Sequence, residues 1–164
     1  MKPEIKQPKI HAGHMECAVA ALLNYRVYTI VPNVSWGAGF RHECDMLAID
    51  SERRFTEVEI KISLSDLKAD FKKSHGHKSN KISRLVYAIP DFLLEKGLPL
   101  IPQTCGVIAV RWSGSRYVAY WVRQARHKVI QKPTEQDITN VMRLGCMRIW
   151  SLKSHNNKAQ SKSK

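Results

Sequence analysis

Two carboxylates and a lysine are grouped between residues 44 and 62 at a spacing that suits metal chemistry. Asp45 lies inside an apolar run, and Glu59 and Lys61 follow it fourteen and sixteen positions later. Glu57, Glu59 and Lys61 alternate with apolar residues, so they share one face of a predicted strand. Like charges held close together are unfavourable unless a cation neutralises them. Because Mg2+ prefers carboxylate and carbonyl oxygens, the pattern predicts a Mg2+ site in which Mn2+ would substitute.

The residues around this group predict a β-hairpin. An apolar segment, 44–50, and the alternating segment, 55–62, are joined by a short polar connection, as in antiparallel strand pairs. This pairing sets Asp45 near Ile60 and within reach of Glu59. The alternative is an ordinary solvated strand face, since alternating charge is common on exposed strands. Asp45, a single carboxylate within an apolar strand, argues against that alternative.

Asp45 together with Glu59-Ile60-Lys61 resembles the Asp…Glu-x-Lys core of the PD-(D/E)XK nuclease superfamily, the restriction-endonuclease-like fold. The resemblance covers residues 16–90, in which the hairpin is followed by a predicted helix and another apolar strand. One departure is Cys44, which stands where the name of the superfamily has proline. The resemblance implies an α/β fold, an αβββαβ core with a mixed central sheet flanked by helices. A C-terminal β-hairpin and helix would extend this core.

The resemblance also implies roles for individual residues. Asp45, Glu59 and the backbone carbonyl of Ile60 would bind Mg2+, and Lys61 would assist the attacking water or stabilise the phosphate. A lysine desolvated beside a metal is expected to have a lowered pKa. Glu16, on the first predicted helix, is either a further metal ligand, as nucleases of this class often have, or a first-turn acid that complements the helix dipole.

These residues predict a Mg2+-dependent endodeoxyribonuclease, a hydrolase that cleaves phosphodiester bonds of DNA. Two other interpretations stay open. One is a non-catalytic nucleic-acid-binding protein that retains the nuclease fold, and the other is a basic scaffold protein of a larger particle. DNA repair, recombination and mobile-element defence are all compatible with a small chain of this type, which would suit a phage or bacterial genome.

The charge balance favours a polyanionic partner. The chain has 27 Lys and Arg against 14 Asp and Glu, a formal net charge of +13, which favours phosphate contacts through counterion release. DNA is favoured over RNA as this partner. No stretch approaches the roughly 18 apolar residues of a membrane span, so a membrane partner is not expected. The polar N-terminus carries no apolar signal core, which predicts a cytoplasmic protein.

A basic segment after the predicted hairpin could grip the phosphate backbone. It follows the residues that would hold the metal, and its glycine-containing loop has nothing to bury. The alternative is a solvated surface loop. The predicted nucleic-acid-binding residues are Lys68, Lys72, Lys73, His75, His77, Lys78, Asn80 and Lys81, with Arg41 from the loop before Asp45.

The cysteines and histidines show no metal-binding spacing. No C-x-x-C pair occurs, which argues against a zinc site and a disulfide framework. The histidine pairs at 11/14 and 75/77 are predicted to lie at the surface or to face phosphate. The thiols predicted to be buried are Cys17, Cys44, Cys105 and Cys146.

The remaining patterns predict one domain with basic ends. Residues 1–10 are predicted to be a mobile basic arm, 11–152 a single nuclease-like domain and 153–164 a disordered basic tail. The C-terminal hairpin is predicted to extend the core sheet, the alternative being a homodimer contact. Further expected elements are helices at 13–24, 63–73, 91–96 and 134–143, the last ended by Gly145, and strands at 26–34, 82–90 (parallel to the Glu59 strand), 105–112 and 117–122.

Overall fold

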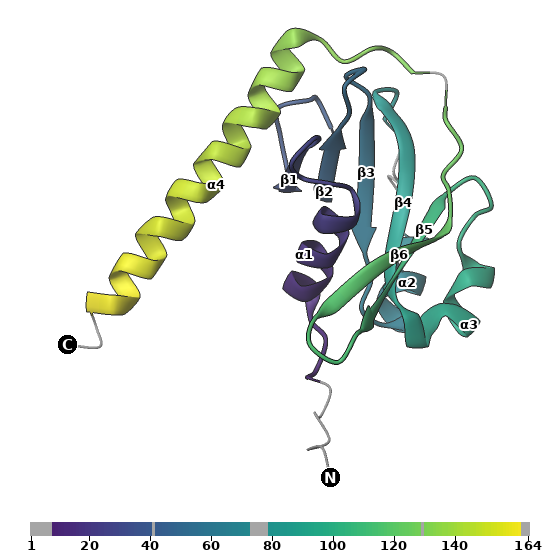
Figure 1. The fold of residues 1–164 in the computed structure, drawn as a ribbon. Coiled ribbons are helices and arrows are strands. Elements are labelled where there is room, and N and C mark those ends of the chain that lie inside the picture. Colours follow the sequence, from purple (N-terminus) through teal and green to yellow (C-terminus); the bar gives the residue numbers. More distant parts are fainter. Residues whose placement is uncertain (1–7, 41, 73–78, 129, 162–164) are drawn as a thin grey trace.

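The computed structural model describes residues 8–40, 42–72, 79–128 and 130–161, which form a mixed α/β fold (Figure 1). Its strands are β1 (Thr29–Val34), β2 (Cys44–Ile49), β3 (Phe55–Ile60), β4 (Ile82–Pro90), β5 (Gly106–Trp112) and β6 (Tyr117–Arg123). Its helices are α1 (Ala12–Leu22), α2 (Leu64–Asp70), α3 (Leu94–Gly97) and α4 (Glu135–Ser161). Two short 3-10 turns, Asp91–Leu93 and Leu98–Leu100, flank α3.

All six strands form one sheet in the order β1-β2-β3-β4-β5-β6. The pairs β1–β2, β2–β3 and β5–β6 are antiparallel, whereas β3–β4 and β4–β5 are parallel. Parallel neighbours need a crossover, and α2 provides it between β3 and β4 while the segment with α3 provides it between β4 and β5. The fold class, both predicted hairpins and the parallel strand at 82–90 are therefore confirmed.

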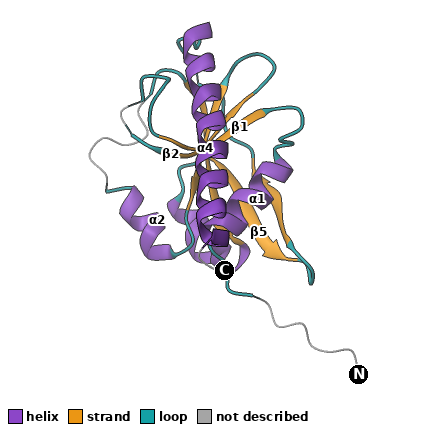
Figure 2. Ribbon diagram, turned by 90° about the vertical axis from the view of Figure 1, so that its left-hand side faces the viewer, coloured by secondary structure: helices purple, strands orange, loops and turns teal. Residues whose placement is uncertain are grey.

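Helices cover both faces of this sheet, with α1 and α2 on opposite sides (Figure 2). Met15 and Val19 of α1 pack in a cluster with Met46 and Val58 of the central strands. On the other face, Leu67 of α2 packs in a second cluster with residues of β4 and β5. Because β3 is covered on both faces, every one of its residues is buried.

The last helix, α4, is longer than the sequence predicted. It continues through Gly145 to Ser161, along the edge strand β1 and then past the sheet (Figure 1). Gly145 does not end the helix but permits its close approach to β1, because a Cβ at this position would lie 3.2 Å from a methyl group of Val31. Residues 153–161, for which the sequence predicted a disordered tail, continue α4, and no proline interrupts the helical hydrogen bonds there.

The N-terminal residues that the structure describes are docked on the domain. The Tyr117 hydroxyl donates a hydrogen bond to the carbonyl of Pro8, and Ile10 packs partly buried against the cluster beneath α1. These contacts correct the expected mobile arm at 8–10, and 1–7 lie outside the described residues.

Candidate functional site

Asp45, Glu59 and Lys61 come together where β2 and β3 meet. The Nζ of Lys61 lies 2.7 Å from Oε2 of Glu59 and 3.9 Å from Oδ2 of Asp45. The backbone N–H of Ile60 donates a 2.7 Å hydrogen bond to the same Oδ2 of Asp45. The antiparallel hairpin therefore sets Asp45 beside Ile60, as the sequence predicted. We call Asp45, Glu59 and Lys61, together with Asp70 of α2, which also contacts Lys61, the Lys61 group.

These charged side chains lie in the protein interior. Glu57, Glu59 and Lys61 are 0%, 2% and 4% exposed, so the alternative of a solvated strand face is wrong. Asp45 differs from them, because its side chain is 37% exposed. The group thus has one member that reaches solvent and others that lie behind it.

Asp70 joins the group from α2 and was not found from the sequence. Its Oδ1 lies 3.1 Å from Nζ of Lys61, and its Oδ2 accepts a 3.0 Å hydrogen bond from the Tyr87 hydroxyl. Ser63 caps α2 by accepting from the N–H of Asp66, which fixes the rotation of the helix. Asp70 lies three residues after the buried Leu67, and this helical spacing was the signal that could have placed it on the inner face.

The neighbours of Lys61 favour its charged form. Burial disfavours its charged form, but the hydrogen bond and charge of Glu59, followed by the charge of Asp70, outweigh burial and raise the pKa of Lys61. The lowered pKa predicted from the sequence applies to a lysine beside a metal ion and stays a prediction. Lys61 is a firmly charged ammonium between two carboxylates.

Glu16 on α1 lies close enough to the Lys61 group to interact electrostatically with Asp45. It is half-buried, and burial raises its pKa, with a further increase from the negative charge of Asp45. The sequence alternative of a first-turn acid is not supported, because the first turn of α1 holds no acidic residue. The carboxylates of Glu16 on α1 and Asp45 on β2 thus lie on the solvent side of the Lys61 group.

A second cluster of side chains lies next to the Lys61 group and was also missed. Nε2 of His42 lies 2.7 Å from Oε1 of Glu57 and 3.8 Å from Sγ of Cys44. Burial raises the pKa of the Cys44 thiol, and the charges of Glu57 and Glu59 raise it further. Of the four thiols predicted to be buried, Cys44 and Cys105 are, whereas Cys17 and Cys146 are exposed.

The predicted nucleic-acid-binding residues fall into three sets. Lys68 and Lys72 are exposed, on α2 and just after it. Asn80 and Lys81 are engaged within the protein: the Asn80 amide donates to Gln131 at 2.9 Å, and Nζ of Lys81 donates to both carboxylate oxygens of Asp137 at 2.8 Å. The remaining residues lie outside the described part of the chain; they are Arg41, Lys73, His75, His77 and Lys78.

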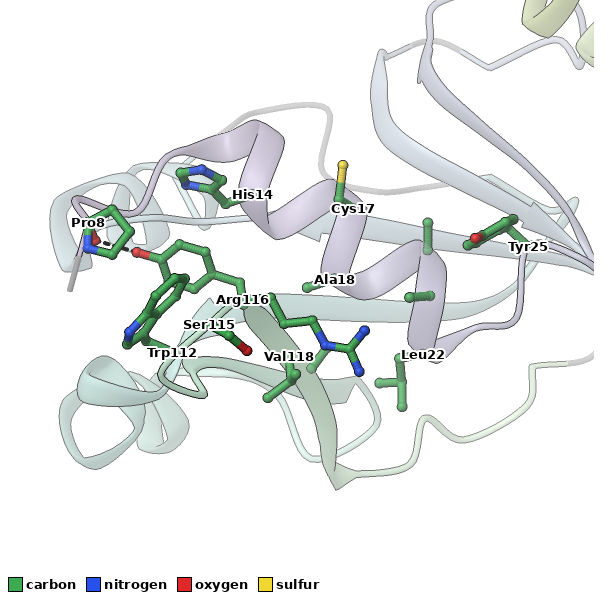
Figure 3. Close-up of a pocket in the computed structure, with 14 residues that line it drawn as sticks. Pro8, His14, Cys17, Ala18, Leu22, Tyr25, Trp112, Ser115, Arg116 and Val118 are labelled. Atoms are coloured by element: carbon green, nitrogen blue, oxygen red, sulfur yellow. Dashed lines mark hydrogen bonds between the residues drawn. The ribbon is translucent and has the colours of Figure 1, made fainter. Parts of the chain in front are cut away.

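A large hollow of the described surface lies elsewhere. A cavity of about 950 Å3 lies between α1 and the β5–β6 hairpin, lined mainly by apolar side chains such as Ala18, Leu22 and Val118, with Arg116 at its rim (Figure 3). None of the members of the Lys61 group lines it. We place the candidate chemistry at the Lys61 group, because carboxylates and a lysine converge there, whereas the cavity is lined mainly by apolar side chains.

Comparisons with known proteins place the chain in a family. No curated protein matches it. A solved structure of a protein of unknown function from Silicibacter pomeroyi is 20% identical, with a TM-score of 0.66, and the match covers 91% of this chain and 96% of that one, which shows the same fold. None of the described helices is both long and apolar enough to cross a bilayer. A family model described as "DNA repair protein MmcB-like" matches residues 3–156. The chain therefore belongs to the MmcB-like family of DNA repair proteins.

Proposed function

We propose that this protein is a PD-(D/E)XK-type, metal-dependent nuclease that hydrolyses phosphodiester bonds of DNA. One observation carries the proposal: Asp45, Glu59 and Lys61 converge from neighbouring β-segments, with Lys61 Nζ within 3.9 Å of both acids. The family membership supports a DNA-related role, and the net charge of +13 suits a polyanionic substrate.

The donor atoms around Lys61 fit a hard divalent ion. Asp45 and Glu59 supply carboxylate oxygens, the Ile60 backbone could add a carbonyl, and Glu16 borders the solvent side. Oxygen ligands of this kind are those that Mg2+ and Mn2+ prefer. When bound, such an ion supplies an activated water and offsets the charge that develops on the phosphate.

The side chains of the chain itself have separable tasks. Asp45 lies at the solvent end, where its carboxylate can accept a hydrogen bond from an incoming water and orient it. Lys61 donates from a fixed ammonium that can neutralise charge developing on the phosphate. Glu59 and Asp70 hold that ammonium at 2.7 and 3.1 Å, so little reorganisation is needed when substrate arrives. Lys68 and Lys72, which are exposed on and just after the helix that carries Asp70, would contact neighbouring phosphates.

A plasmid-nicking assay tests the proposal. Purified protein is incubated with supercoiled DNA and Mg2+ or Mn2+, with and without EDTA, as wild type, Asp45→Ala and Lys61→Ala. The matched controls are Asp66→Ala and Lys96→Ala, which replace exposed residues of α2 and α3. We expect metal-dependent nicking that both site variants lower by at least about 100-fold and that both controls retain. Equal nicking by all five proteins would indicate a contaminating nuclease and contradict the proposal.

A second candidate function is a DNA-binding protein without catalysis. It is favoured by the engagement of Lys61, which Glu59 and Asp70 already pair inside the protein. This alternative predicts that no nicking occurs with either ion and that DNA affinity is the same for wild type and Glu59→Ala. Electrophoretic mobility shifts measured with and without Mg2+ separate the two candidates.

A further inference from the structure

We propose that His42, Cys44 and Glu57 form a second metal site, one that takes a borderline-soft divalent ion such as Zn2+. The three residues come from the loop before β2, from β2 and from β3. One ligand atom from each lies within 4.8 Å of the other two. The site is separate from the Lys61 group, and it does not depend on the proposed nuclease activity.

One of the three distances in the cluster is close to that of a tetrahedral ion, one is shorter, and the third, from Sγ to Oε1, lies within 4.8 Å. Zinc bonds of about 2.0–2.1 Å to nitrogen and oxygen and about 2.3 Å to sulfur place neighbouring ligand atoms about 3.4–3.6 Å apart. Nε2 of His42 and Sγ of Cys44 are 3.8 Å apart, and Nε2 and Oε1 of Glu57 are 2.7 Å apart. A widening of the second distance by about 0.7 Å, which a small side-chain rotation gives, would open the position for an ion.

The donor types select the ion. An imidazole nitrogen, a thiolate sulfur and a carboxylate oxygen together suit Zn2+ or Co2+, whereas Mg2+ takes oxygen ligands. The oxygen donors of the Lys61 group lie one and two residues further along the same strands, at Asp45 and Glu59. The two neighbouring sites would therefore differ in selectivity: the cluster with nitrogen and sulfur donors would bind Zn2+, and the Lys61 group with oxygen donors would bind Mg2+.

Binding of an ion would offset the cost of burying the charged groups of this cluster. Cys44 and Glu57 are fully buried, and the side chain of His42 is 7% exposed. Charges in such a place are costly unless they are paired or coordinate a metal. On binding, the ion takes the lone pairs of Nε2, Oε1 and Sγ. The thiol proton leaves to solvent, and the proton of the hydrogen bond between Nε2 and Oε1 is released to solvent or moves to Nδ1 of His42. The ion would fix the loop before β2 and hence the start of the strand that carries Asp45.

Cobalt spectroscopy tests the site directly. The full-length chain, with any affinity tag removed, carries Cys17→Ser and Cys146→Ser so that exposed thiols cannot bind metal. Titration with Co2+ should give a thiolate-to-cobalt charge-transfer band that saturates at one equivalent. Zn2+ should displace the cobalt, and excess Mg2+ should not. Absence of the band in this folded background protein would overturn the proposal.

Single variants assign the ligands. Cys44→Ser should abolish the band, whereas Cys105→Ser, at the other buried thiol, should keep it. His42→Gln and Glu57→Gln should weaken Co2+ binding at least about tenfold, and Asp45→Asn should leave it unchanged because that residue belongs to the neighbouring group. Circular dichroism establishes that each variant is folded, and Cys44→Ala replaces Cys44→Ser if the serine does not fold. A band that survives loss of the Cys44 thiol would refute this assignment.

Discussion

Lys61 and Lys81 both pair with buried or partly buried carboxylates, but the number of carboxylates near each lysine differs. Nζ of Lys61 lies near three acids, Glu59 at 2.7 Å, Asp70 at 3.1 Å and Asp45 at 3.9 Å. Nζ of Lys81 instead donates to both oxygens of a single acid, Asp137, at 2.8 Å.

The difference separates a structural ion pair from a candidate functional site. Asp137 also accepts 2.8 Å hydrogen bonds from the backbone N–H and hydroxyl of Thr134, so it caps α4 as well as pairing with Lys81. One acid and one lysine are balanced. Around Lys61, the described residues place three carboxylates against one ammonium, and two of these are almost fully buried. Carboxylate oxygens gathered at a partly open position are the donors that a hard divalent cation prefers.

The largest expected effect is on stability when either lysine is replaced by methionine. Lys61→Met leaves Glu59 and Asp70 buried without the ammonium, and we expect a loss of about 3–5 kcal/mol in the free energy of unfolding. Lys81→Met should cost about 1–2 kcal/mol, because Asp137 keeps its hydrogen bonds from Thr134. Urea denaturation at neutral pH measures both. Equal losses would remove the distinction between the two lysines.

Divalent metal should compensate for one of these variants more than for the other. In Lys61→Met the carboxylates of Asp45, Glu59 and Asp70 are released from the ammonium, so Mg2+ or Mn2+ should bind more tightly than in wild type. At a concentration one hundred times the dissociation constant, binding adds about 2.7 kcal/mol of stability. Thermal unfolding with increasing metal should therefore raise the Tm of Lys61→Met more than that of Lys81→Met, which keeps the Lys61 group intact and should respond as wild type does. Equal rises in Tm for the two variants would contradict this expectation.

Much of the Lys61 group could be predicted because its key contacts are local. Asp45 and Glu59 are joined by one hairpin, and the alternation of β3 fixes which face carries Glu59 and Lys61. The parallel pairing of β4 follows from the helix between the two strands. These inferences needed only the period of the sequence and the length of a turn.

The unpredicted parts depend on contacts between distant segments. Lys81 pairs with an acid 56 positions away, so its charge seemed available for DNA. His42, just before β2, meets Glu57 of β3 fifteen positions away, and no spacing rule predicts that contact. Gly145 was expected to end the last helix, but it lies inside α4 and packs closely against Val31 of β1. Glycine is common both at helix ends and at close contacts, and the sequence alone does not distinguish the two.

The Lys81 pair should also show itself in the pH dependence of stability. Partial burial opposes ionisation of Asp137, but the hydrogen bonds from Lys81 and Thr134 outweigh it and lower the pKa of this carboxyl. Because the folded pKa lies below the unfolded one, the stabilisation is complete above about pH 4 and is lost as pH falls through the folded pKa. Asp137→Asn should thus cost about 1 kcal/mol at pH 7, and this difference should shrink at pH 3.

Urea denaturation at the two pH values checks this expectation. Glu95→Gln, at an exposed residue of α3, serves as the control and should show a difference close to zero at both. A cost for Asp137→Asn that stays constant down to pH 3 would mean that its charge contributes nothing.

The smallest expected effect concerns DNA binding and contrasts Lys81 with the exposed lysines on and just after α2. Lys68→Ala and Lys72→Ala should each reduce the magnitude of the negative slope of log K against log salt concentration by about 1, where K is the association constant for DNA. Each substitution removes one phosphate contact. Their stability should change by less than about 0.5 kcal/mol, since both side chains are exposed. Lys81→Met should behave in the opposite way, losing stability while its salt dependence stays that of wild type. Fluorescence anisotropy at several salt concentrations, with Lys96→Ala as the control, measures these slopes. If Lys81→Met reduced the magnitude of the slope as much as Lys72→Ala, Lys81 would have to leave Asp137 to reach DNA, and a balanced ion pair would no longer mark a purely structural lysine.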